Sequence, residues 1–421
     1  MFVFYAKKYS IIVSETAVKN KRMSFVSNNR CVAHFDLDSF FVSVERRDNR
    51  KLAGVPLVVG GGERGVVASA SYEARKFGVK SAMSVKLAKR LCPDLVIVKG
   101  DMEKYSRESR AVTAIISSQV PLFEKSSIDE FYIDLTGMDR FFGCEQLTGE
   151  LRRKIQRDTG LAISRGLSVN KLVSKVATNE SKPNGQISVP LGCEKSFLAP
   201  LAVNKLPMVG DKTGELLRRM GVETIQTLSE IPMPMLMNLL GKNGIELSRR
   251  ANGIDETPVI PYHEQKSIGT ENTFDADTIN ISFLQDQLVR MSEQVAYELR
   301  AGDRLAGCVT VKIRYSDFQT FTKQVTVPYT ASDHLLIATA KELFNRLYDR
   351  RLLVRLIGVR VSHLIPGNYQ INLFDDTQEM VKLYQSIDSI KRQFGEQLMK
   401  RAVGLVSDRY QEEKRAVTKN R

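Results

Sequence analysis

Residues 126–137 read SSIDEFYIDLTG and place two adjacent carboxylates, Asp129 and Glu130, between a polar turn and a strand-like run. The run FYIDL that follows them is rich in aromatic and branched residues, which favours a β-strand, and the Thr-Gly pair after it favours a strand end. Adjacent side chains on a continuous strand point to opposite faces, so both acids reach one ion only at a hairpin end or a bulge. Taken alone, such a pair is most often a solvated surface feature.

A second acidic stretch, residues 31–45, reads CVAHFDLDSFFVSVE and carries Asp36 and Asp38. It begins as a short strand and becomes helical from about Ser39, a candidate N-cap followed by apolar residues at helical spacing. A strand ending in acids, an acidic hairpin and a basic chain together indicate a divalent-metal site for phosphates. Carboxylate and phosphate oxygens are the ligands that Mg²⁺ prefers in proteins.

Four stretches carry most of the sequence's information about its family. They are FDLDSFFVSVE at 35–45, VVASASYEARKFGVKSAMS at 66–84, SIDEFYIDLTG at 127–137 and GLSVNKLVSKVATNESKPNG at 166–185. Taken together they resemble the Y-family translesion DNA polymerases of the DNA polymerase IV (DinB) type. They stand in that family's order and at its spacing, and the resemblance covers about residues 30 to 375.

The resemblance implies an α+β multidomain fold, a right-hand polymerase with palm, fingers and helical thumb plus a ferredoxin-like βαββαβ little-finger domain. Strand and helix patterns after residue 266 follow the same β-α-β-β-α-β order. The expected divisions are a basic N-terminal extension at 1–29, a palm at 30–190 with fingers inserted at about 40–101, a helix-hairpin-helix thumb at 191–256, a linker at 257–266, the little finger at 267–366 and a tail with a clamp-binding motif at 367–421.

Composition and charge are consistent with a multidomain protein that binds a polyanion. A chain of 421 residues is too long for one typical core, so two to four domains are expected. The net charge of +14 favours nucleic acid first and an acidic membrane surface second. No apolar run approaches the length of a bilayer span, so no membrane association is expected. Five scattered cysteines without a CxxC pair argue against zinc and disulfides and favour the cytoplasm.

The resemblance assigns the catalytic acids. Asp36, Asp129 and Glu130 are expected to hold two Mg²⁺ ions, with the Leu37 carbonyl as a possible extra ligand. Asp38 is the nearest competitor for a ligand role, because spacing along one strand places it on the same face as Asp36.

The resemblance also assigns nucleotide-binding residues, each of which has an ordinary structural alternative. Phe41 matches an aromatic steric gate against ribonucleotides, although a core aromatic of an amphipathic helix would look the same. Ser69 lies in a run of small residues expected over the templating and incoming bases, or in a closely packed ordinary strand. Tyr72, Arg75 and Lys171 match triphosphate contacts, and a guanidinium binds such a group bidentately. Solvated helix faces are the alternative for these three.

DNA contacts are expected in the thumb and the little finger. Residues 206–213 resemble the glycine-bearing loop of a helix-hairpin-helix, whose backbone N–H groups approach phosphates without reading sequence. Four strand charges, Lys312, Arg314, Lys323 and Arg355, could follow a phosphate backbone. A solvated sheet face explains each of the four equally well.

Residues 370–374 read QINLF, the form of the peptides with which bacterial polymerases bind the sliding clamp. Leu373 and Phe374 would anchor in a pocket, and Gln370 would supply a polar contact. The alternative is a solvated loop. Further on, apolar residues from Met380 to Phe394 recur at spacings of three and four, which predicts an amphipathic helix. We expect its apolar stripe to pack on the chain's own domains.

The expected function is a template-directed DNA polymerase that adds deoxynucleotides to a primer 3′-hydroxyl by two-metal phosphoryl transfer, with low fidelity and lesion bypass. The expected partners are primer-template DNA, deoxynucleoside triphosphates and the sliding clamp, and the chain is expected to act as a monomer. A catalytically silent DNA- and clamp-binding scaffold on the same fold is the main alternative. A nucleotide cyclase with a similar palm is a weaker one, because the thumb-like and clamp-binding segments argue against it.

Overall fold

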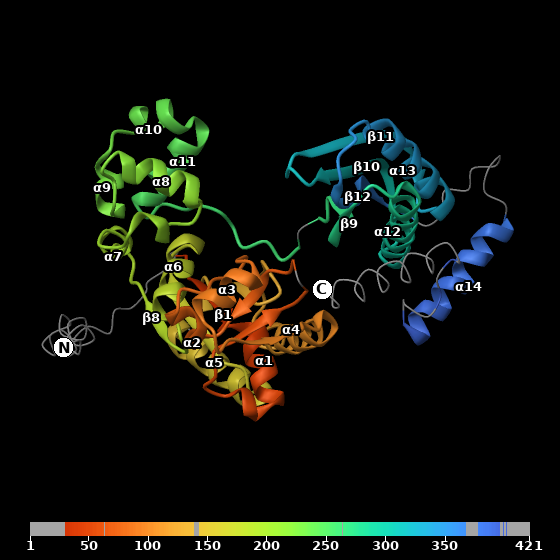
Figure 1. Cartoon of the computed structure of the whole chain (residues 1–421). Helices are drawn as coiled ribbons and strands as arrows, with labels where there is room; N and C mark the ends of the chain where they lie inside the picture. Colours follow the sequence, from red (N-terminus) through yellow and green to blue (C-terminus); the bar gives the residue numbers. More distant parts are fainter. Residues whose placement is uncertain are drawn as a thin grey trace, which may run out of the picture. The chain divides into compact units, whose positions relative to one another are not determined.

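The protein divides into two compact units (Figure 1). The first unit comprises Met1–Gly61 with Val66–Tyr262, and the second comprises Gly62–Gly65 with His263–Arg421. The computed structural model describes residues 30–62, 64–138, 143–262, 264–367, 378–395, 399 and 401. No helix in these ranges is long and apolar enough to cross a membrane.

A five-stranded sheet, which we call the palm sheet, has the strand order β5-β6-β1-β7-β8. Its central strand β1 pairs antiparallel with both β6 and β7, so the two acidic stretches of the sequence become neighbours. The hairpin predicted before Glu130 is present, because β5 ends at Lys125 and pairs antiparallel with β6. The palm strands are β1 Val32–Leu37, β5 Phe123–Lys125, β6 Glu130–Asp134, β7 Ile163–Ser168 and β8 Gln186–Ser188.

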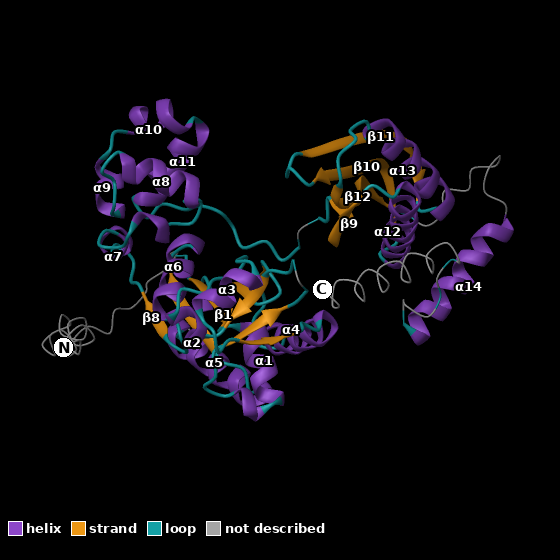
Figure 2. Cartoon of the chain, viewed as in Figure 1, coloured by secondary structure: helices purple, strands orange, loops and turns teal. Residues whose placement is uncertain are grey.

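Helices cover both faces of the palm sheet (Figure 2). Phe35 of β1 and Phe131 of β6 lie in a core with apolar residues of α1, α4 and α5. The opposite face carries His34 and Asp36 and is covered by α6, whose Thr178 hydroxyl donates to the His34 carbonyl. The palm helices are α1 Phe40–Asp48, α4 Met102–Ser117, α5 Cys144–Thr159 and α6 Lys171–Ser181.

A smaller three-stranded sheet with the order β3-β2-β4 follows α1. Strands β2 and β3 pair antiparallel, so they form a hairpin. The elements of this finger region are the 3₁₀ helix Arg50–Leu52, β2 Leu57–Gly60, β3 Val67–Ala70, α2 Tyr72–Lys76, α3 Val85–Leu91 and β4 Val96–Val98.

The thumb is helical, and its core includes one side of α6. Leu172, Val173 and Val176 of α6 lie in the same apolar cluster as Leu217 and Leu247 of the thumb. The thumb elements are α7 Glu194–Leu198, the 3₁₀ helix Val203–Lys205, α8 Asp211–Arg219, α9 Ile225–Glu230, α10 Met233–Leu240 and α11 Lys242–Ala251.

The second unit contains a four-stranded antiparallel sheet with the order β11-β10-β12-β9, and helices α12 and α13 pack on one of its faces (Figure 2). The expected βαββαβ element order is confirmed. Val311, Ile313 and Tyr315 lie in the core, so Lys312 and Arg314, which alternate with them, point to the helix-free face. The elements are β9 Ser267–Thr278, α12 Ile281–Ala301, β10 Arg304–Tyr315, β11 Thr320–Thr330, α13 Asp333–Leu347 and β12 Val354–Pro366.

The predicted C-terminal helix is present as α14, Gln378–Phe394, and it packs on the second unit. Its contact differs from the expected apolar one. Asp388 is buried and accepts hydrogen bonds from Arg300 of α12 at 2.7 and 2.9 Å, and the Tyr384 hydroxyl bonds His334. Leu383 and Phe394 of the expected stripe are 49% and 59% exposed. An amphipathic pattern therefore located the helix but not the face by which it docks.

Candidate active site

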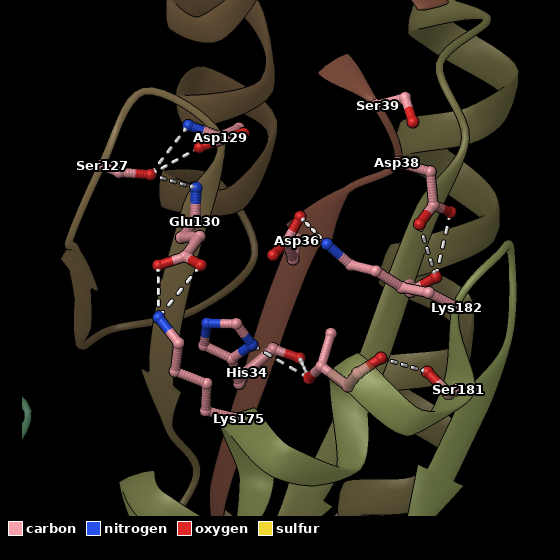
Figure 3. Close-up of polar contacts among 12 residues, drawn as sticks. His34, Asp36, Asp38, Ser39, Ser127, Asp129, Glu130, Lys175, Ser181 and Lys182 are labelled. Carbon is pink, nitrogen blue, oxygen red and sulfur yellow. Dashed lines mark hydrogen bonds and ion pairs between the residues drawn. The ribbon is translucent and has the colours of Figure 1, made fainter. Parts of the chain in front are cut away.

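Strand pairing brings Asp36 and Glu130 together. In the register of β1 against β6 the two residues are direct partners, so both side chains lie on the α6 face of the palm sheet. Asp36 is only 5% exposed, at the end of a fully buried strand. Figure 3 shows the two carboxylates on neighbouring strands.

Asp129 lies in the turn immediately before β6, which is the hairpin end that the sequence required. The Ser127 hydroxyl donates to Asp129 Oδ1 at 2.6 Å and accepts from the Glu130 backbone N–H at 3.1 Å (Figure 3). The Asp129 carbonyl accepts from the Leu37 N–H at 3.1 Å. These bonds hold the turn against the end of β1.

Two lysines neutralise the acidic face. Lys182 Nζ lies 2.5 Å from Asp36 Oδ1, and Lys175 Nζ lies 2.8 Å from Glu130 Oε2 (Figure 3). Burial is the largest influence on Asp36 and raises its pKa to about 7, with smaller upward contributions from Asp129 and Glu130. The ammonium of Lys182 acts in the opposite direction and lowers that pKa.

Asp38, the competing candidate ligand, is fully engaged by protein donors. Its carboxylate accepts from the Ser164 hydroxyl at 2.9 and 3.0 Å, the Asn184 N–H at 2.8 Å and the Tyr72 hydroxyl at 3.2 Å. The chain turns at Ser39, whose φ of 44° is left-handed, so Asp38 does not continue the face of Asp36. This geometry favours a structural role for Asp38 and leaves Asp36 as the β1 acid that faces the open space.

That open space is a cavity of about 150 Å³ between the palm and the finger region. Its lining includes Asp36, Leu37 and Asp129 from the palm and Ser69 and Arg75 from the fingers. Phe41 also lines it, half-buried, with its ring stacked on Tyr105 at a centroid distance of 4.3 Å. The cavity thus combines carboxylates, a guanidinium and an aromatic wall.

Arg75 is oriented by its neighbours. Its Nε donates to the Ala70 carbonyl and its Nη2 donates to the Ser39 hydroxyl, both at 3.1 Å. The guanidinium lies 4.7 Å from the centroid of the Tyr72 ring. Ser39, the predicted N-cap of α1, makes no capping bond, because its hydroxyl donates to the Ala70 carbonyl instead.

Comparison with known proteins identifies the family. Two family models match, the impB/mucB/samB family over residues 35–179 and its C-terminal domain over residues 265–373. A DNA polymerase IV from Dehalococcoides mccartyi (strain CBDB1) is 39% identical over 371 residues, which are 87% of this chain and 95% of that protein. The chain belongs to the DNA polymerase IV family of Y-family DNA polymerases. Its members are template-directed polymerases of the translesion class, and this polymerase shares that activity.

Further comparisons agree with this family. A DNA polymerase IV from Caulobacter vibrioides is 36% identical over 369 residues, which are 86% of this chain and 91% of that protein. A solved Y-family DNA polymerase chimera matches with a TM-score of 0.73 at 25% identity, covering 80% of this chain and all of that one. The right-hand fold with an added little-finger domain, expected from the four motifs, is confirmed.

Polymerases of this family depend on divalent metal ions, and the oxygen donors at the palm suit a hard cation. Asp36, Leu37 and Asp129 line one cavity, and Glu130 faces the same side of the sheet as Asp36. Within the described ranges, however, no three acidic, histidine or cysteine side chains are gathered closely enough to hold a metal. Lys175 and Lys182 hold two of the three carboxylates instead.

Two of the five predicted nucleotide-binding residues, Tyr72 and Lys171, do not line the polymerase cavity. The Tyr72 hydroxyl bonds Asp38. Lys171 is engaged farther from the cavity. Its Nζ lies 2.7 and 2.8 Å from the two carboxylate oxygens of Glu124 on β5, and it stands 4.6 Å from the centroid of the Tyr132 ring. Glu124 is itself buried and accepts the Ile260 N–H. A lysine at the start of a helix suggested a phosphate ligand, but a buried acid on a distant strand engages it here.

Lys175 and Lys182 are not among the residues expected from the sequence to act at the site. The signal that could have found them is spacing, because positions 171, 175 and 182 lie at i, i+4 and i+11 and therefore share one side of α6 and its extension. His34 was not expected at the site either. It is buried between the Lys175–Glu130 and Lys182–Asp36 pairs, with its Nδ1 2.9 Å from the Thr178 hydroxyl. Burial lowers the pKa of His34, and the three nearby lysines add to that effect.

Proposed function

We propose that Asp36, Asp129 and Glu130 are the catalytic acids of this polymerase and hold two Mg²⁺ ions, with the Leu37 carbonyl as a further ligand. The observation that carries this assignment is the pairing of Asp36 with Glu130 across β1 and β6, beside a turn that presents Asp129 to the same cavity. Bound divalent ions supply charge neutralisation for the leaving pyrophosphate and lower the pKa of the primer 3′-hydroxyl. Phosphoryl transfer needs chiefly positioning and charge, so no covalent nucleophile is required.

The incoming deoxynucleotide is proposed to bind in the cavity against Phe41, Ser69 and Arg75, which line it. Tyr72, whose ring lies beside the Arg75 guanidinium, is proposed to contact the triphosphate as well. The stacked ring of Phe41 leaves little space beside a sugar, which supports its role as a steric gate. Arg75 is held with its guanidinium at the cavity wall, where it would meet an anionic phosphate. Lys171 is proposed to join the triphosphate only after leaving Glu124.

Primer extension with purified protein, Mg²⁺ and the four deoxynucleotides tests the assignment. The double variant Asp129→Ala, Glu130→Ala is expected to lose extension while retaining DNA binding. Glu150→Ala, which removes an exposed acid of α5, is the matched control and should extend primers like the parent. Extension by the double variant would refute the assignment, and DNA binding without extension by the parent would favour the silent scaffold.

Clamp binding through Gln370, Leu373 and Phe374 is also proposed. These residues lie outside the described ranges, so the support is the QxxLF form itself and its position directly after the last strand of the little finger. The double variant Leu373→Ala, Phe374→Ala should lose binding to a bacterial sliding clamp in a pull-down. Asn372→Ala, at a position that the motif leaves free, should retain it, and clamp binding by the double variant would exclude the motif.

Oligomeric state and cellular location are also open to proposal. We propose that the polymerase is a monomer that acts in the cytoplasm on primer-template DNA. Lys312 and Arg314 on the helix-free sheet face would contribute to the DNA contact, although Lys312 also pairs with Glu271. Light scattering coupled to size-exclusion chromatography tests the monomer, and a dimer mass would exclude it.

A further inference from the structure

Two lysines of α6 and the lysine directly after it form a row that faces a row of acids on the palm sheet. Lys171 pairs with Glu124 of β5, Lys175 with Glu130 of β6 and Lys182 with Asp36 of β1. One side of a single helix and the turn after it thus meet acids on three adjacent strands. The first pair is separate from the cavity, whereas the other two engage proposed metal ligands.

The two pairs at the site are poorly hydrated, which makes their charge balance important. Exposed fractions are 7% for the Asp36 side chain, 21% for Glu130, 21% for Lys182 and 28% for Lys175. A carboxylate removed from water in this way needs a cation, because an uncompensated buried charge is strongly destabilising. In this structure a lysine ammonium group lies beside each of the two carboxylates.

We infer that Lys175 and Lys182 are internal counter-ions that occupy the cation positions of the metal-free active site and are displaced when divalent metal binds. This inference rests on the proposed assignment of Asp36, Asp129 and Glu130 as metal ligands. Lys182 is the clearer member of the pair, because its side chain lines the same cavity as Asp36 and Asp129. An ammonium and a divalent ion cannot use the same carboxylate lone pairs at full strength, so the two cations compete.

If lysine and metal compete, removing the lysine changes stability and metal affinity in opposite directions. A merely structural ion pair does not predict this. Removing Lys182 should weaken the folded chain without metal and at the same time tighten its affinity for metal. A structural pair would lower stability equally with and without metal and would leave the affinity unchanged. The lysines are therefore positioning residues, which keep the acids in place while the site lacks metal.

The experiment uses the full chain without DNA or nucleotide, with Mn²⁺ alone as the probe, titrated by calorimetry at pH 8. We expect Lys182→Met to lower the Mn²⁺ dissociation constant at least about tenfold, which is about 1.4 kcal/mol in binding free energy. Lys182→Arg, which keeps the charge, should return the affinity to near the parent value. Melting temperatures in EDTA and in Mn²⁺ provide the second readout, and the gain on adding Mn²⁺ should be larger for Lys182→Met than for the parent.

Lys104→Met is the matched control. Lys104 is a palm lysine with a side-chain exposure of 20%, close to that of Lys182, and it pairs with Glu45 and Asp48 away from the cavity. It should lose stability without any change in Mn²⁺ affinity.

The outcomes separate the inference from the metal assignment. Mn²⁺ binding that survives in Asp129→Ala, Glu130→Ala overturns the assignment of ligands. Binding that this double variant loses, but that Lys182→Met leaves unchanged or weakens, overturns the counter-ion inference alone. No Mn²⁺ binding by the parent and by Lys182→Met would also overturn it.

Discussion

Asp36 and Glu130 are direct partners in the antiparallel register of β1 and β6. The period of a strand is two residues, so a slip of one residue would send one of the acids to the apolar face of the palm sheet. Phe35 and Phe131, which neighbour them, are also direct partners, and both lie in the core of the opposite face. The same packing that buries the two phenylalanines therefore fixes the two acids beside each other.

Phe41 is expected to exclude ribonucleotides. Phe41→Ala removes the ring that lines the cavity, so a 2′-hydroxyl no longer meets a wall. We expect the ratio of kcat/KM for deoxy- over ribonucleotides to fall at least about tenfold, since discrimination built on a clash is lost with the clash. Single-nucleotide primer extension measures this ratio. Phe77→Ala, at an exposed phenylalanine of the finger region, should leave it unchanged, and an unaltered ratio in Phe41→Ala would rule out the gate.

Asp38 is expected to stabilise the folded protein. Asp38→Ala leaves the Ser164 hydroxyl and the Asn184 N–H without their acceptor in a nearly buried place. We expect a loss of about 2–4 kcal/mol in the free energy of unfolding, typical of a buried polar network. Urea denaturation followed by circular dichroism measures it. Unchanged stability together with lost Mn²⁺ binding would instead make Asp38 a metal ligand.

Gly166 on β7 is a point of close approach between the palm sheet and α6. A Cβ there would overlap the Ser174 carbonyl oxygen and lie 2.6 Å from the Thr178 nitrogen, both in the helix backbone. Gly166→Ala should therefore displace α6 and lower the free energy of unfolding by about 3 kcal/mol. Gly149→Ala in α5 is the control, because its nearest atom is 4.0 Å away. That change should be neutral or stabilising, by up to about 1 kcal/mol. Equal effects in chemical denaturation would contradict the close approach.

The ion pair between Arg47 of α1 and Glu108 of α4 is expected to make stability depend on pH. The two groups share bonds of 2.6 and 2.8 Å, and the guanidinium holds the pKa of Glu108 below its usual range. A carboxylate with a lowered pKa stabilises the fold above its unfolded value, about 4.3, and loses that contribution as the pH falls further. The melting-temperature difference between parent and Glu108→Gln should therefore be largest near pH 6 and shrink towards pH 3. A difference that is constant across this range would exclude the pair as its cause.

Asp388 is expected to anchor α14. Asp388→Ala removes the acceptor of two Arg300 bonds in a buried network that also includes Asp333. We expect a loss of about 2 kcal/mol in the free energy of unfolding, at the low end for a broken buried pair because Asp333 remains. Cleavage by trypsin within α14 should also be faster. Leu383→Ala, at an exposed position of the same helix, should behave like the parent, and equal cleavage rates for all three proteins would argue against anchoring through Asp388.

Local patterns in the sequence predicted much of the fold. Alternation located the strands of the little finger, and helical spacing located its helices and the helix that ends at Phe394. Both patterns are readable because the backbone sets a period of two residues in a strand and about 3.6 in a helix. The acidic hairpin was also predictable, since Asp129 and Glu130 follow a turn and precede a clear strand. The catalytic assignment needed the family's four motifs, because an acidic pair alone is usually a surface feature.

Contacts between distant segments were not predictable. Lys171 begins a helix, which suggests a phosphate ligand, but no local pattern indicates that Glu124 lies within reach across the palm. Lys182 lies in a turn whose sequence predicts only the turn, and its pairing with Asp36 depends on how α6 crosses β1. Leu383 and Phe394 show the same limit, because spacing identifies an apolar side without saying what covers it.

Helix α6 packs on the palm sheet and is also part of the thumb core. One side carries Lys175 against the acids of the palm, and the other carries Leu172 and Val176 in the thumb core. The helix has eleven residues, so we expect a shift of its palm side to move its thumb side as well. Thumb mobility, measured as amide hydrogen exchange in α8 and α11, would then depend on which cation pairs with the palm acids. The described residues that line their cavity include none from the thumb.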